Sequence, residues 1–183
     1  DVLVTGLSSS GRIAQLYTND GSGNFSLVTG TPFAGVGKSS IAFADVDGDN
    51  DQDVLITGEN NFGQPVSQLY TNDGSGNFSL VSGTPFDEVS ESSIAFADVD
   101  GDNDQDVLIT GVDASSSTAI AKLYTNDGSG NFSLVSGTPF DGVISSSIAF
   151  TDVDGDNDQD VLITVDNVSG LKAKLYTNDG SGN

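Results

Sequence analysis

Asp45-Val46-Asp47-Gly48-Asp49-Asn50-Asp51-Gln52-Asp53 is an acidic stretch that runs directly into the apolar residues 54–58. The same nine residues recur at 98–106 and at 152–160. Five aspartates alternate with other residues in each copy, and like charges about 4 Å apart repel by about 1 kcal/mol even in water. A hard divalent cation removes that penalty, because Ca²⁺ takes six to eight oxygen ligands and a loop with alternating carboxylates can wrap one. The spacing therefore predicts a calcium loop in each copy.

The first loop can be assigned ligand by ligand. The side chains of Asp45, Asp47, Asp49 and Asp53 are predicted to bind the ion, and Asp51 is predicted to contribute its backbone carbonyl. Glycine at position four and asparagine at position six tolerate the positive φ that a tight loop needs. An EF-hand is excluded, because the twelfth position is an isoleucine in a β-rich run instead of a glutamate. The alternative is a solvated acidic turn without metal.

Composition excludes several classes of function. The net charge of −22, from 5 basic and 27 acidic residues, should repel nucleic acid and anionic membranes. No apolar run approaches the length of about eighteen residues that a membrane helix needs. Cysteine and histidine are absent, which excludes disulfides, thiolate or imidazole metal sites and histidine-based triads. We therefore expect no nucleic-acid binding and no membrane insertion.

Internal repetition organises the rest of the chain. The ninth residues of the three loops and Asp1 are spaced by 52, 53 and 54 residues. Asp1 therefore matches the ninth position of a fourth loop, and we expect the chain to be an internal piece of a longer one. The differences in spacing arise in one variable segment per repeat, at 7–15, 59–68, 112–122 and 166–174.

Each repeat is predicted to form four short strands separated by turns. Large and small residues alternate in the first strand, so Phe43 is expected to sit over an alanine such as Ala95 of the next sheet. No segment has a helical period, so we predict an all-β chain. Four antiparallel strands at a period near fifty describe one blade of a β-propeller. In the first complete repeat the strands are expected near 41–46, 53–57, 68–71 and 78–81, with a hairpin turn at 72–76.

The chain is expected to form one repeat domain, 1–183, of about 3.5 repeats. Three strands precede the first complete repeat and three follow the second, which gives fourteen strands. Because propellers typically have four to eight blades, the chain should belong to a longer array that closes into a ring or continues as an open filament. The predicted blades are 1–40 (partial, strands two to four), 41–93, 94–147, and 148–183 (partial, strands one to three).

The acidic loop, with Leu-Tyr-Thr-Asn-Asp-Gly-Ser-Gly-Asn-Phe at 69–78 downstream, resembles FG-GAP and VCBS-type repeats. Such repeats occur in secreted and surface bacterial proteins, and related repeats build the propellers of integrin α-subunits. The resemblance covers essentially the whole chain and implies calcium in the loop between the first two strands. It departs at Asn50, Asn103 and Asn157, where the family usually has glycine, but asparagine tolerates left-handed geometry. It extends the ligands to Asp98, Asp100, Asp102 and Asp106, and to Asp152, Asp154, Asp156 and Asp160, with the carbonyls of Asp104 and Asp158.

Three other recurring sets each have two interpretations. N-glycosylation triplets start at Asn24, Asn77, Asn131 and Asn167, and the alternative is that these asparagines close hairpins. A second cation site or plain turns would account for Asp20, Asp73, Asp127 and Asp179. Sugar stacking or packing between blades would account for Tyr17, Tyr70, Tyr124 and Tyr176.

Two functional hypotheses follow. The first is a non-catalytic, extracellular or cell-surface module with a structural or adhesive role, stabilised by Ca²⁺. Its partners would be a surface protein or further copies of the repeat, in the same chain, a homo-oligomer or a filament. The second is a carbohydrate-binding, lectin-like propeller that uses the variable segments, although Phe62 is their only aromatic residue. Near-identical repeats offer no single asymmetric set of catalytic groups, so we do not expect an enzyme.

Overall fold

The computed structural model describes residues 1–165 and 172–180, and these residues form fourteen strands and no helix. The all-β prediction is therefore confirmed. Nothing in these two ranges could cross a membrane as a helix.

The strands form four antiparallel sheets that follow the order of the chain. Sheet A contains β1 (Val2–Ser8), β2 (Gly11–Asn19) and β3 (Phe25–Leu27). Sheet B contains β4 (Gly37–Ala44), β5 (Asp53–Glu59), β6 (Pro65–Asn72) and β7 (Phe78–Leu80). Sheet C contains β8 (Val89–Ala97), β9 (Asp106–Asp113), β10 (Ala119–Asn126) and β11 (Phe132–Leu134). Sheet D contains β12 (Ser146–Thr151), β13 (Asp160–Val165) and β14 (Lys172–Tyr176).

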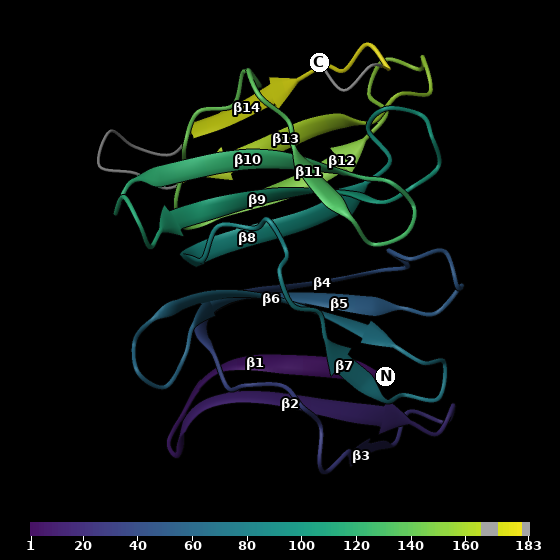
Figure 1. Cartoon of the computed structure of the whole chain (residues 1–183), viewed down its shortest axis with the longest axis vertical. Helices are drawn as coiled ribbons and strands as arrows, with labels where there is room; N and C mark the ends of the chain where they lie inside the picture. The colour runs from purple at the N-terminus through teal and green to yellow at the C-terminus, as the bar shows by residue number, and fades with distance from the viewer. Residues whose placement is uncertain (166–171, 181–183) are drawn as a thin grey trace.

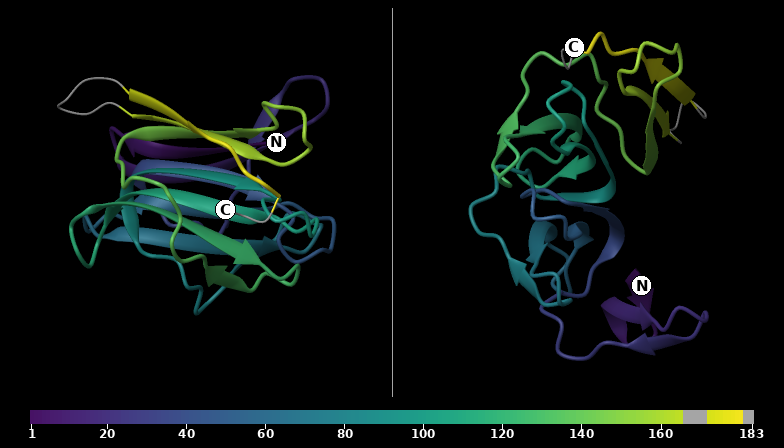
Figure 2. Two further views of the ribbon diagram at one scale, coloured as in Figure 1. Left: turned by 90° about the horizontal axis from the view of Figure 1, so that it is seen from above. Right: turned by 90° about the vertical axis from the view of Figure 1, so that its right-hand side faces the viewer.

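The four sheets stack face to face in chain order, with sheet A at one end and sheet D at the other (Figure 1). Seen from the side, they follow an open arc instead of a closed ring (Figure 2). Each sheet is an up-and-down meander, as expected for a propeller blade. The sheets therefore build a propeller-like array whose two end sheets each have one neighbour.

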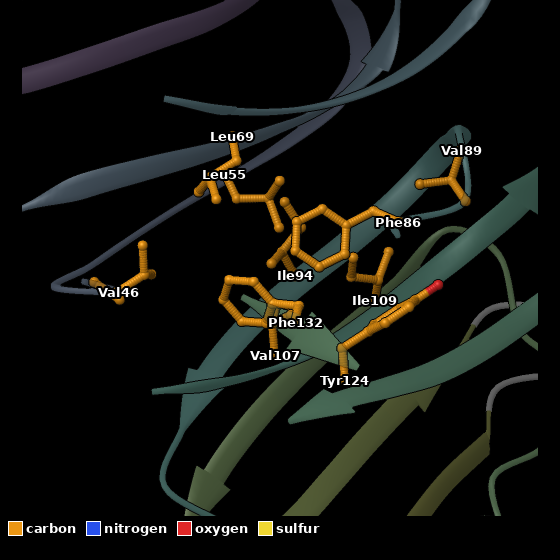
Figure 3. Packing of buried hydrophobic residues seen from close by; sticks show 11 residues of the cluster. Val46, Leu55, Leu69, Phe86, Val89, Ile94, Val107, Ile109, Tyr124 and Phe132 are labelled. Carbon is orange, nitrogen blue, oxygen red and sulfur yellow. The ribbon is translucent and has the colours of Figure 1, made fainter. Parts of the chain in front are cut away.

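The hydrophobic core lies between the sheets. Successive side chains of a strand point to opposite faces, so Val54 packs with sheet A while Leu55 packs with sheet C. The layer between sheets B and C joins Leu55 to Val107 and Ile109, among others (Figure 3). Burying each of these side chains contributes roughly 1.5–3 kcal/mol. The equivalent layers lie between A and B and between C and D.

Aromatic side chains reinforce each junction between sheets. Phe33 follows sheet A and packs on sheet B. Its ring centroid lies 5.0 Å from that of Tyr70, which it meets edge-on, and 5.0 Å from that of Phe78. The same arrangement recurs when Phe86 packs on Tyr124 and Phe132, and when Phe140 packs on Tyr176. Tyr70 and Tyr124 are buried. For Tyr70 and Tyr124 this confirms packing between blades, one of the two interpretations.

Two details of the predicted sheets are wrong. The first strand of sheet B begins at Gly37 and ends at Ala44, because a register shift between Gly37 and Ser40 lets pairing continue to Glu59. The expected direction of Phe43 is also reversed. Ala44 faces sheet C and belongs to the core cluster between sheets B and C, against which Phe96 packs. Phe43 points to the opposite face and is 39% exposed. The large residues of each first strand thus point back toward the preceding sheet, and no Phe43–Ala95 stack forms.

Candidate metal centres

Three acidic loops join the first and second strands of sheets B, C and D. In the first loop Gly48 has a φ of 79° and Asn50 a φ of 70°, which is the left-handed region. The asparagines at 103 and 157 have φ values of 72° and 75°. The three loops therefore share one tight conformation, and asparagine takes the left-handed position as predicted.

Each loop brings three carboxylates together. Asp45, Asp47 and Asp53 each place one oxygen within 4.8 Å of the other two. The equivalent groups are Asp98, Asp100 and Asp106, and Asp152, Asp154 and Asp160. A set of ligands made only of carboxylate oxygens suits a hard cation such as Ca²⁺. Three clusters that could hold a metal ion thus lie where the sequence predicts them.

The ninth residue of each loop is fully buried. Asp53 Oδ2 accepts the Val46 N–H at 2.9 Å and Oδ1 accepts the Asn72 N–H at 2.8 Å. Each oxygen keeps one lone pair, so these bonds leave room for a cation. Burial raises the pKa of Asp53, and it raises the pKa of Asp106 to about 6. The same pair of bonds recurs at Asp106 and at Asp160.

One carboxylate oxygen of the third residue in the first loop lacks a hydrogen-bond partner. Asp47 Oδ1 is buried and accepts no hydrogen bond. Burial raises the pKa of Asp47, and the nearby charge of Asp49 raises it further. A desolvated, unpartnered oxygen among like charges is costly unless a cation lies beside it. The residues present therefore fit a bound Ca²⁺, which Asp45, Asp47 and Asp53 would hold.

Asp45 and Asp49 also shape the backbone of the first loop. Asp45 accepts the N–H groups of Gly48 and Asn50, both at 2.8 Å, and Asp49 Oδ1 accepts the Asp51 N–H at 2.9 Å. The carboxylates of Asp49 and Asp51 are not part of the three-oxygen cluster. The ligand roles expected for the Asp49 side chain and the Asp51 carbonyl stay predictions, as do those of their equivalents Asp102, Asp104, Asp156 and Asp158.

The seventh residue of each loop touches the hairpin of its own sheet. The Asp51 carboxylate lies so close to Gly74 that a Cβ at that glycine would collide with it. The same holds for Asp104 beside Gly128 and for Asp158 beside Gly180. Glycine in the hairpin is therefore needed twice, for its positive φ of 74° at Gly74 and for the space that the carboxylate takes.

Sequence reasoning missed the asparagine that ends β10 and its equivalent, which lies two residues after β14. Asn126 Nδ2 donates to the Val46 carbonyl at 2.8 Å, and Asn178 Nδ2 donates to the Val99 carbonyl at 2.7 Å. Each bond joins one sheet to the acidic loop of the preceding sheet. The recurrence of this asparagine in every repeat was a signal, but turn formation explained it equally well.

The hairpin residues have local explanations. Asp73 Oδ1 accepts the Ser75 N–H at 2.9 Å, and Oδ2 accepts from Asn77 Nδ2 at 2.8 Å. These bonds lower the pKa of Asp73, and the hairpins at 20–24 and 127–131 repeat them. Turn formation therefore accounts for these aspartates. Glycosylation of the exposed Asn24, Asn77 and Asn131 stays a prediction, and Asn167 lies outside the described residues.

The fold and the loops define a repeat protein of stacked antiparallel sheets, with a carboxylate cluster that could hold a metal ion between the first two strands of sheets B, C and D. The model of the FG-GAP-like repeat family matches residues 1–56 and 45–109. These matches cover more than half of the chain, which belongs to this family. The FG-GAP resemblance is thus confirmed.

The fold has a relative among solved structures. A fucose lectin from Kordia zhangzhouensis, solved in complex with methyl-fucoside, is similar with a TM-score of 0.50. The similarity covers 74% of this chain and 90% of that chain at 12% sequence identity, so it concerns the fold alone. No curated protein matches the sequence.

Proposed function

We propose that this chain is a non-catalytic, calcium-stabilised repeat module with a structural or adhesive role outside the cell. The observation that carries the proposal is the threefold recurrence of a carboxylate cluster whose first copy contains the buried, unpartnered Asp47 Oδ1. Every dense acidic cluster repeats in the same form, which favours a shared structural role over a single catalytic centre.

Bound calcium would supply the positive charge that these clusters lack. At millimolar calcium and a dissociation constant of roughly 0.1 mM, each site would add about 1.4 kcal/mol to the free energy of unfolding. Three divalent ions carry six positive charges, so they would change the formal charge from −22 to −16. Asp53 would transmit this gain to the sheet, because it also bonds Val46 and Asn72.

Thermal unfolding tests the calcium role. In excess Ca²⁺ the melting temperature should exceed that in EDTA by on the order of 10 °C, since about 4 kcal/mol shifts a chain of this length by 2–4 °C per kcal/mol. Asp47→Asn should reduce the calcium-dependent part of the shift. Asp73→Asn, a hairpin aspartate outside the loops, should leave it intact. Equal melting temperatures in calcium and EDTA would contradict the proposal.

Further sheets of the same repeat are the partners that best suit the end sheets. Val2 is 41% exposed whereas its equivalent Val54 is fully buried, and Leu162 is 38% exposed whereas Leu55 is fully buried. These faces match the ones that the inner sheets bury against each other. Sheets from the same chain or from another copy would cover them, in a ring or a filament.

Carbohydrate binding is the second candidate. The fold is similar to that of the Kordia zhangzhouensis lectin solved with methyl-fucoside, and Phe62 in the β5–β6 loop is 89% exposed. Calorimetric titration with methyl-fucoside tests this candidate, with Phe62→Ala as the loop variant. Heat of binding that disappears in the variant would favour a lectin, and the absence of binding at millimolar ligand would count against fucose recognition.

A further inference from the structure

One buried asparagine contacts two acidic loops at once. Asn126 ends β10 and is 5% exposed. Its side-chain Nδ2 donates to the Val46 carbonyl in the loop of sheet B at 2.8 Å. Its backbone N–H donates to Asp106 Oδ1 in the loop of its own sheet C at 2.9 Å. Asp106 is one of the three clustered carboxylates of that second loop.

The same connection recurs one sheet further on. Asn178 Nδ2 donates to the Val99 carbonyl in the loop of sheet C at 2.7 Å, and its N–H donates to Asp160 Oδ1 in the loop of sheet D at 2.8 Å. The hydrogen bonds therefore link the three loops in series. At the first junction the hairpin of sheet C adds contact, because Gly130 lies against Asp47 and the Gly128 carbonyl lies beside Gly48.

We propose that Asn126 and Asn178 couple the three loops, so that a divalent cation bound in one loop raises the affinity of its neighbour. The proposal rests on the calcium role proposed above. A cation that fixes loop 45–53 also fixes the Val46 carbonyl, which holds Asn126 in place. Asn126 then holds Asp106 in the position from which it contributes to the second cluster, so less ordering remains to be done when the second ion binds.

The sign of the expected coupling separates this route from charge effects. A first Ca²⁺ makes the protein less negative and weakens the attraction for a second one, which is negative cooperativity. Salt at about 0.15 M limits that effect to a range of roughly 8 Å. Positive cooperativity at this salt concentration therefore needs a structural connection, and by linkage it must act equally in both directions.

Asn72 offers a matched control. It stands at the equivalent position of sheet B, and its N–H bonds Asp53 as Asn126 bonds Asp106. Its side chain accepts the Gly76 N–H at 3.2 Å in its own hairpin. The described residues contain no acidic loop in sheet A for its Nδ2 to reach. Asn72→Ala thus removes a hairpin contact without removing a connection between loops.

Calcium titration followed by amide NMR tests the coupling. Gly48, Gly101 and Gly155 bond Asp45, Asp98 and Asp152, so their amide signals report each loop separately. The wild-type protein should give Hill coefficients above 1. In Asn126→Ala the calcium affinities reported by Gly48 and Gly101 should fall by about 5-fold or more. Binding in the loops reported by Gly101 and Gly155 should stay coupled. Asn72→Ala should stay within about 2-fold of the wild type.

Each other outcome has a defined meaning. If none of the three glycine amide signals responds to calcium, no loop binds it, and the proposed function and the coupling are both overturned. Binding with a Hill coefficient of 1 in the wild type, or an equal loss in Asn72→Ala and Asn126→Ala, would overturn the coupling alone. If Asn126→Ala does not fold, Asp47→Asn replaces it. That variant weakens the first loop and should lower the affinity at Gly101 by about 5-fold, and an unchanged affinity there would overturn the coupling.

Discussion

The ninth aspartate of each loop shows how a carboxylate can be buried in this fold. Asp106 is fully buried, and it accepts the N–H groups of Val99 and Asn126. These bonds favour the charged form, but burial outweighs them and raises the pKa of Asp106 to about 6. In the absence of a cation, the folded protein therefore holds this proton more tightly than the unfolded chain does.

The raised pKa predicts a pH dependence of the metal-free protein. The stabilising contribution of Asp106 is complete below its ordinary pKa of 3.8 and is lost as the pH rises through about 6. In EDTA, ¹³C NMR of the Asp106 carboxyl should give a midpoint near 6. Excess calcium should lower this midpoint, because cation and proton compete for the same oxygens.

Asp73 is the control for this titration, since its turn bonds lower its pKa and it lies outside the clusters. Its midpoint should stay below the ordinary value with or without calcium. An Asp106 midpoint below 4 in EDTA would contradict the burial argument.

Two glycines of one hairpin predict different costs of substitution. Gly74 and Gly76 have φ values of 74° and 82°, so alanine costs about 1–2 kcal/mol of strain at either position. A Cβ at Gly74 would also displace the Asp51 carboxylate, whereas nothing lies within 4 Å of a Cβ at Gly76. Gly74→Ala should therefore lower the free energy of unfolding more than Gly76→Ala does. Urea denaturation measures the gap, which should shrink when Asp51→Ala is added. An equal cost at both glycines would contradict the contact.

At the scale of strands and loops, sequence reasoning succeeded where the signal was local. The run 54–56 and the Asp-Gly turn at 73–74 marked β5 and the β6–β7 hairpin, because apolar β-formers and positive-φ residues act through their own backbone. The register shift in β4 was missed, since residues 37–40 show no alternation. Phe43 was placed toward the wrong sheet, because alternation tells which residues share a face but not which neighbour covers that face.

The candidate sites follow the same division. The repeated acidic loop and its asparagine in the left-handed conformation could be predicted from spacing alone. Spacing could not show that Asp45, Asp47 and Asp53 converge while the carboxylates of Asp49 and Asp51 stay outside the cluster. That difference depends on contacts of the folded loop, where Asp49 accepts the Asp51 N–H and Asp51 lies against Gly74. The role of Asn126 depends on a carbonyl 80 residues away in the sequence. Such a contact exists only once the sheets are stacked.

The aromatic contact between sheets B and C predicts which substitution destabilises their junction. Phe86 is 7% exposed and packs on Tyr124 at 5.1 Å and Phe132 at 5.0 Å. Phe86→Ala should lower the free energy of unfolding by about 3–5 kcal/mol, measured by urea denaturation in calcium. Phe62→Ala removes an 89% exposed ring and should change it by no more than about 0.5 kcal/mol. Similar costs for the two variants would mean that the segment containing Phe86 does not hold sheets B and C together.

For the whole molecule, stacking has to overcome repulsion among 27 acidic residues. Two of the five basic residues join neighbouring sheets. Arg12 of sheet A pairs with Glu59 of sheet B at 2.6 Å, and Lys38 of sheet B pairs with Glu91 of sheet C at 3.0 Å. Apolar layers and these pairs hold neighbouring sheets together, while the proposed calcium ions would neutralise the acidic loops. Calcium should therefore favour contact between sheets, whereas salt weakens both the repulsion and these ion pairs.

The end faces predict head-to-tail association between copies of this chain. Val4 is 41% exposed and its equivalent Ile56 is fully buried against the preceding sheet, whereas Leu162 corresponds to Leu55, which is buried against the following sheet. The face of sheet A should therefore dock on the face of sheet D of a second copy, which is a heterologous contact. Sedimentation velocity in calcium and 0.15 M salt should show concentration-dependent association of the wild type.

Mixing two variants tests the direction of this contact. Val4→Asp and Leu162→Asp each bury a charge in one of the two faces and should each be monomeric, because a charge without a partner is costly to desolvate. An equimolar mixture retains one intact face of each kind and should form a dimer that grows no further. Leu27→Asp is the control. Leu27 is 48% exposed, but its equivalents Leu80 and Leu134 are 53% and 51% exposed inside the array, so that variant should associate like the wild type. If Val4→Asp alone still dimerises, the copies meet through identical faces and the head-to-tail arrangement is wrong.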